Sequence, residues 1–113
     1  MPTDEDIFEK LRIDLRRGSL ILAVLGALRE ERYGYTLRQS LEDAGLPIDE
    51  GALYPLLRRL EAQGLLTSEW REEGKRNKRF YRLSPEGVAV LAQLLGEWNA
   101  ISESILRLTE RKI

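Results

Sequence analysis

The sequence predicts a mostly α-helical (α+β) single domain spanning residues 1–113, with one short β-hairpin and a long last helix. The chain has 113 residues, a single-domain length. Apolar residues recur at helical spacing along most of it, and a strand-like period replaces this only near residues 65–83. With 42% hydrophobic and 33% charged residues, the composition is that of a globular protein.

Two helices are expected at the start of the chain. Apolar residues at positions 7, 8, 11 and 15 indicate a helix within residues 5–15, and Gly18 interrupts the pattern. Ser19 is a good cap for a second helix reaching about Arg32, whose inner face carries Leu20, Val24, Leu25 and Leu28.

A tight turn and two further helices follow. Residues 33–35 (Tyr-Gly-Tyr) indicate a turn, after which Thr36 caps a short helix over residues 37–43 that Gly45 ends. The next helix starts near residues 49–51 and runs to Gln63, with Gly64 as its stop. On a helical wheel its inner face carries Leu53, Leu56, Leu57 and Leu60.

Strand formers then replace the helical pattern. Residues 65–71 and 78–83 predict two strands, joined by a turn over residues 72–77 that contains Gly74. Ser84-Pro85-Glu86 combines a cap, a first-turn proline and a first-turn acid, and so predicts a last helix to about Lys112. This order is that of a winged helix-turn-helix, with a two-stranded wing, over residues 15–84.

The charge distribution points to nucleic acid. The net charge is −1, but residues 54–82 hold eight basic and four acidic side chains, giving +4 against −5 elsewhere. The outer face of the helix at 51–63 is small at Gly51 and Ala52 and then offers Tyr54, Arg58 and Arg59. The hairpin adds Lys75, Arg76, Lys78 and Arg79 for phosphates. Each set taken alone also fits an ordinary solvated surface.

Four segments of the chain resemble the PadR-like transcriptional regulators. They are residues 15–20 (LRRGSL), 33–35 (YGY), 51–61 (GALYPLLRRLE) and 78–84 (KRFYRLS). The resemblance covers about residues 15–110 and fits the short group without an extra C-terminal domain. It implies a dimeric repressor, often released from DNA by a small molecule. It also implies that Tyr35, Tyr54, Pro55 and the basic residues of the wing lie near DNA.

The last helix carries an apolar seam with steps of three and four residues. Its members are Leu91, Leu94, Trp98, Ile101, Ile105 and Leu108. Such a seam needs a partner, so residues 85–113 are expected to form a dimerisation helix that packs with its copy and with the N-terminal helix at 5–15. A purely intramolecular seam is the alternative.

Trp98 lies in the middle of this seam. Two copies facing each other across a dimer axis would form a stacking site for a planar aromatic compound, lined by Leu94 and Ser102. Alternatively, Trp98 only fills the dimer core.

Other functions find little support. The chain has no cysteine or histidine, which removes the usual metal ligands and nucleophile–base pairs, so we expect neither an enzyme nor a cofactor. No apolar run is long enough to cross a membrane, and the acidic N-terminus is unlike a secretory signal, so a cytoplasmic protein is expected. A winged helix that binds protein instead of DNA remains the second hypothesis.

Overall fold

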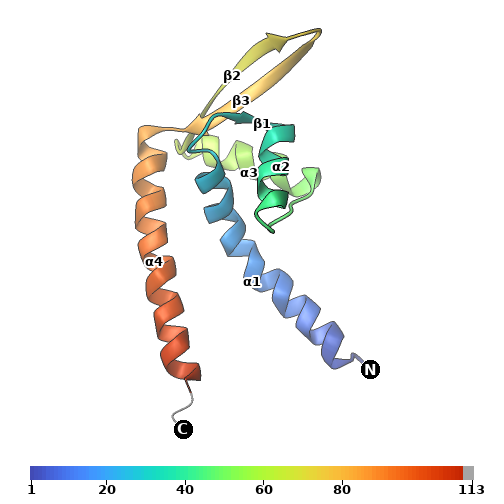
Figure 1. The fold of residues 1–113 in the computed structure, drawn as a ribbon, viewed down its shortest axis with the longest axis vertical. Coiled ribbons are helices and arrows are strands. Elements are labelled where there is room, and N and C mark those ends of the chain that lie inside the picture. The colour runs from blue at the N-terminus through green and yellow to red at the C-terminus, as the bar shows by residue number, and fades with distance from the viewer. Residues whose placement is uncertain (111–113) are drawn as a thin grey trace.

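A computed structural model describes residues 1–110 as four helices and a three-stranded sheet (Figure 1). The winged helix-turn-helix expectation is confirmed. In chain order the elements are α1 (Asp4–Ala27), β1 (Arg32–Tyr33), α2 (Gly34–Asp43), α3 (Glu50–Ala62), β2 (Leu66–Glu73), β3 (Arg76–Leu83) and α4 (Pro85–Thr109).

Helix α1 is one continuous helix, so the expected division at Gly18 is wrong. Thr3 and Asp6 form a reciprocal capping box at its start. Ser19 caps nothing; its hydroxyl donates to the carbonyl of Leu15 one turn earlier, at 3.2 Å. A glycine inside a helix costs only about 1 kcal/mol relative to alanine, which 24 residues of helix readily absorb.

Helices α2 and α3 form the helix-turn-helix. Helix α2 begins at Gly34, earlier than expected, because the Thr36 hydroxyl bonds both the amide and the carbonyl of Tyr33. Asp49 caps α3 by accepting a hydrogen bond from the amide of Ala52 at 2.8 Å. Gly45 and Gly64 follow these helices with φ of 83° and 81°, the left-handed conformation in which glycine ends a helix.

The sheet has the antiparallel order β1-β3-β2. The hairpin is longer than expected: pairing continues out to Glu73 opposite Arg76, so the turn contains only Gly74 and Lys75. Residues 72, 73, 76 and 77, expected in the turn, belong to the strands. Residues 32 and 33, expected in a helix end and a turn, instead form β1, which pairs with Tyr81 and Phe80 of β3.

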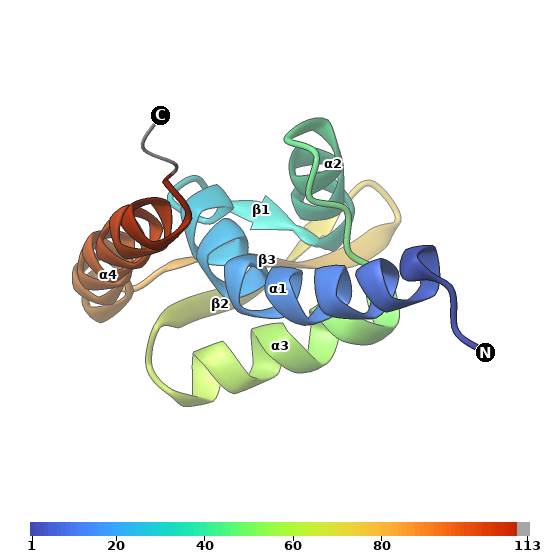
Figure 2. The ribbon, with the colours of Figure 1, turned by 90° about the horizontal axis from the view of Figure 1, so that it is seen from below.

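The core lies where the second half of α1 meets α2, α3 and the base of the hairpin. Figure 2 shows α1 running between α2 and α3, with α4 to one side. The largest fully buried side chains are Val24, Leu25, Leu28, Leu37, Leu53, Leu57 and Leu60. The expected inner faces of α1 and α3 therefore supply most of this core, although Leu20 and Leu56 are only half-buried.

Helix α4 starts as expected and leaves the core as an arm. The Ser84 hydroxyl accepts from the amide of Gly87 at 2.9 Å and donates to the carbonyl of Gly64 at 2.6 Å, which ties the helix start to the end of α3. The far ends of α1 and α4 diverge (Figure 1). The expected end near Lys112 lies outside the described residues.

Candidate nucleic-acid interface

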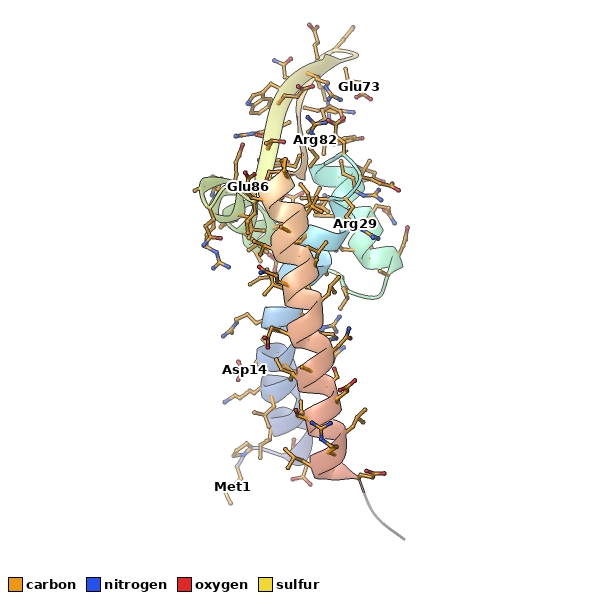
Figure 3. The ribbon with its side chains drawn as sticks, turned by 90° about the vertical axis from the view of Figure 1, so that its left-hand side faces the viewer. Met1, Asp14, Arg29, Glu73, Arg82 and Glu86 are labelled. Carbon is orange, nitrogen blue, oxygen red and sulfur yellow. The ribbon has the colours of Figure 1, made fainter. Side chains whose placement is uncertain are left out.

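A groove lies between the starts of α2 and α3 and the inner face of the hairpin. Basic and aromatic side chains line it together: Tyr33, Tyr35, Arg38, Tyr54, Arg58, Trp70, Arg76, Lys78, Arg79 and Tyr81. Among residues 1–110, Glu50 is the one acidic residue that lines it. The hairpin extends well beyond the core, as Figure 3 shows with Glu73 near its outer end and Arg82 near its base.

Helix α3 presents to solvent the residues predicted from the sequence. Gly51, Ala52, Tyr54, Pro55, Arg58 and Arg59 are all exposed, whereas Leu53, Leu57 and Leu60 anchor the helix beneath them. The small side chains at the start of the helix leave its backbone open to a close approach. The two guanidinium groups follow one to two turns later.

Gly34 and Tyr54 are packed against each other at the junction of the two helices. A Cβ atom on Gly34 would lie 2.1 Å from the Tyr54 hydroxyl oxygen and 3.0 Å from Cζ of the same ring. The first distance is shorter than any contact between non-bonded heavy atoms of this kind. The absence of a side chain at Gly34 therefore fixes where the Tyr54 ring rests. Tyr54 keeps 37% of its surface exposed, and Tyr35 beside it is also exposed.

Arg38 of α2 reaches the start of α3. Its guanidinium forms an ion pair with Glu50 at 3.0 Å, and its Nε is buried without a hydrogen-bond partner. A buried N–H without a partner is costly, so the Nε of this groove-lining arginine is an unmet hydrogen-bond donor. No sequence pattern pointed to Arg38, because a single arginine on a helix resembles any other surface residue.

The basic residues of the wing differ in how free they are. Lys75 and Arg76 at the tip are exposed. Lys78 is half-buried: its Nζ lies 4.3 Å from the centre of the Tyr33 ring and 3.8 Å from a carboxylate oxygen of Glu73. A cation over an aromatic face is attracted by the negative face of the ring, so Lys78 also holds β1 against the wing.

Arg79 links the wing to α3. Its Nη2 donates to Glu61 at 2.9 Å and its Nε to the Ser68 hydroxyl at 2.9 Å, while Ser68 donates to Glu61 at 2.6 Å. The side chain predicted to meet phosphate is thus held by a closed hydrogen-bonded triangle. Burial raises the pKa of the nearby Tyr81 phenol. The positive charge of Arg79 lowers that pKa, because it favours the phenolate, but the effect of burial is larger.

A second ion-pair network fixes the wing on its other face. Arg71 donates to the two carboxylate oxygens of Glu31 at 2.6 and 2.7 Å, and also bonds Glu69. Its guanidinium lies 4.6 Å from the centre of the Phe80 ring. This bidentate bond lowers the pKa of Glu31 and raises that of Arg71.

The seam predicted on α4 divides into an anchored part and a free part. Leu91 is buried in the core and Leu94 is half-buried against it. Beyond them Trp98, Ile101, Ile105 and Leu108 are exposed, Trp98 with 40% of its surface, while Ser102 beside them is half-buried. The first helix likewise exposes Ile7, Phe8 and Leu11. Within one chain, therefore, these two apolar stretches do not cover each other.

Two other kinds of feature, a metal-ligand cluster and a membrane-spanning helix, are missing from residues 1–110. No group of three or more carboxylates there is arranged to hold a metal ion. None of the helices in this part of the chain is long and apolar enough to cross a membrane.

Comparisons with known proteins agree with this architecture. The profile of the family described as "Transcriptional regulator PadR-like family" matches residues 21–93. The chain is 41% identical over 81 residues to Transcriptional regulator Rv3488 of Mycobacterium tuberculosis, covering 71% of this chain and 76% of that protein.

Solved structures extend the similarity to most of the chain. A PadR family transcriptional regulator from Eggerthella lenta has a TM-score of 0.90 and 44% identity, with 96% of each chain covered. A transcriptional regulator from Clostridium thermocellum has a TM-score of 0.79 and 30% identity, covering 86% of this chain and 99% of the other. The chain belongs to the PadR-like family of transcriptional regulators.

Proposed function

We propose that this protein binds double-stranded DNA as a homodimer and acts as a repressor that a planar aromatic ligand releases. The groove that joins α2, α3 and the wing carries the DNA-binding part of this proposal. Arg58 and Arg76 line it and are exposed, and the exposed residues Arg59 and Lys75 lie next to them in the sequence. Helix α3 enters the major groove and the wing tip reaches the adjacent backbone or groove.

The second copy is proposed from the uncovered apolar side chains of the two arms. Phe8 and Leu11 on α1 and Ile101 and Ile105 on α4 are each about half exposed or more. Covering such side chains gains roughly 25 cal/mol per Å², and the most economical cover is the matching pair of arms from a second chain. A dimer also places two reading heads on one duplex, which paired half-sites require.

The ligand site is proposed at Trp98. This indole is 40% exposed in the middle of the free seam, with Leu94 and Ser102 on the same stripe. Two such rings across the dimer axis form a stacking site for a flat aromatic molecule. A planar dye should quench the fluorescence saturably, and the Trp98→Phe variant should abolish the effect. Quenching that survives this substitution places the dye elsewhere.

The first experiment is binding to mixed duplex DNA at low and moderate salt, with the dimer confirmed by sedimentation. We expect affinity to fall steeply with salt, with two chains per site. The Arg58→Ala variant should weaken binding and reduce the slope of log K against log salt by about 1. Arg29→Ala removes the same charge outside the groove and serves as the matched control.

Either outcome is informative. If a folded dimer fails to bind even at low salt, the DNA-binding proposal is wrong and the winged helix is a protein-interaction module. If it binds, a site selected from random duplexes can be placed over a promoter. The amount of transcript should then fall when the protein is added and recover when the dye is added. If the transcript falls but does not recover, release by the ligand is refuted and repression is not.

A further inference from the structure

Trp70 is an exposed tryptophan on the wing. Its exposure is explained neither by packing in the core nor by the proposed pairing of α1 and α4 with a second copy. It keeps 65% of its surface exposed and lines the groove together with Tyr54, Arg58 and Arg76. A tryptophan usually buries most of its large apolar surface. Leaving one in water on an extended hairpin therefore calls for a partner.

The register of the hairpin places Trp70 on the inner face of the wing. Trp70 lies directly opposite Arg79, and Ser68 opposite Tyr81, so these four side chains share one face of the sheet. Tyr81 is buried against the core, and Arg79 and Ser68 bond Glu61 of α3. The face that carries Trp70 is thus the face that looks along α3.

Its neighbours hold the indole in place without covering it. The Arg79 guanidinium carbon lies 5.7 Å from the centre of the ring, and the bonds of Arg79 to Glu61 and Ser68 fix that charge. A ring attracted to a fixed cation loses little conformational entropy on binding a partner. The exposed remainder of the ring is a flat apolar surface in the groove that Arg58 and Arg76 also line, and their charges attract phosphates.

We infer that Trp70 is a DNA contact, which packs its indole against deoxyribose rings of the backbone beside the site that α3 reads. The inference rests on the proposed DNA-binding function. The arginines that line the same groove bind phosphates of the duplex, and the indole covers an apolar sugar of that backbone. The triangle of Arg79, Ser68 and Glu61 is the platform that positions the ring.

Fluorescence measures this contact directly. Trp70 and Trp98 are the two tryptophans of the chain, so Trp98→Phe leaves Trp70 as the only indole. In that variant we expect saturating duplex to protect Trp70 from acrylamide, with the quenching constant falling at least about threefold. Unchanged access to acrylamide in a saturated complex overturns the inference while leaving DNA binding established.

Salt dependence separates the indole from the charges. Trp70→Ala should weaken DNA binding at least about fivefold and leave the slope against salt unchanged, because no phosphate contact is lost. Arg76→Ala is the matched comparison and should reduce the slope by about 1. Thermal unfolding should be nearly equal in both variants, since both side chains are exposed.

Two other results are decisive. Trp70→Ala that binds DNA like the unsubstituted protein refutes the contact. Trp70→Ala that changes the sedimentation of the free protein instead of its DNA affinity assigns the indole to self-association. If the unsubstituted protein does not bind duplex at all, the proposed DNA-binding function is wrong. That failure is seen before any Trp70 variant is measured, so the two failures are distinguishable.

Discussion

Substituting Gly34 by alanine should weaken DNA binding through α3 without unfolding the protein. A Cβ at this position would lie 2.1 Å from the Tyr54 hydroxyl oxygen, whereas ordinary contacts begin near about 3.5 Å. The tip of Tyr54 must therefore move by about 1.4 Å. Because this ring is partly exposed, it swings toward the groove and gives way.

The two free energies should respond differently. Overpacking a rigid core costs about 1–3 kcal/mol, but here the neighbour is a mobile tip, and alanine gains up to about 1 kcal/mol over glycine in a helix. We expect the free energy of unfolding to change by less than about 1 kcal/mol. Losing one hydrogen bond from Tyr54 to DNA should weaken binding by about 1 kcal/mol, or about fivefold.

A double-mutant cycle decides whether Gly34 acts through Tyr54. Urea unfolding and fluorescence anisotropy with labelled duplex are measured for Gly34→Ala, Tyr54→Ala and the double variant. With Tyr54 removed, Gly34→Ala should cost no further affinity. An equal loss in both backgrounds refutes the reasoning. Gly18→Ala, where a Cβ meets nothing within 4 Å, is the control and should stabilise the fold with unchanged affinity.

Three further predictions follow from the same structure. Gly87→Ala places a Cβ 2.1 Å from the Leu65 carbonyl oxygen. Because the backbone cannot swing aside as a side chain does, the free energy of unfolding measured in urea should fall by about 2 kcal/mol or more. An unchanged urea midpoint would contradict this packing. Glu50→Gln removes the acidic residue of the groove and should tighten DNA binding by up to about 1 kcal/mol at low salt, a gain that shrinks at high salt; weaker binding would mean that Glu50 positions Arg38 productively. Because the bond from Arg71 lowers the pKa of Glu31, the folded state favours the carboxylate, so its stabilising effect is present above the ordinary glutamate pKa of about 4.3 and is lost as pH falls below it. Glu31→Gln should accordingly flatten the fall of Tm in acid, and an equally steep fall would exclude this pair as a cause.

Local signals predicted the boundaries that local chemistry sets. Ser84-Pro85 marks the start of α4, Asp49 the start of α3 and Gly64 its stop, because caps and left-handed glycines act within a few residues. The prediction that Gly18 divides the first helix was wrong. A helix tolerates one glycine when the part of the helix after that glycine is packed in the core.

Features created by tertiary pairing could not be found in the same way. Strand β1 has two residues and exists because Tyr33 and Arg32 pair with β3. The exposed residues of α3 were predictable from its helical wheel. The link between Arg79 and Glu61, the orientation of Arg38 and the exposure of Trp70 were not, because each depends on how a strand or helix distant in sequence is placed.

Helix α4 works geometrically as a lever fixed at one end. The helix has 25 residues and is about 37 Å long. Its first turns are anchored by Ser84 and Leu91, and most of the rest of the helix does not contact the core of its own chain. Rotating the free part from Leu91 to Thr109, which is about 27 Å long, by about 7° displaces its far end by about 3 Å, close to the rise of one base pair. In the proposed dimer, a rotation of that size where two such helices cross would therefore change the spacing of the two DNA-binding regions by about one base-pair step.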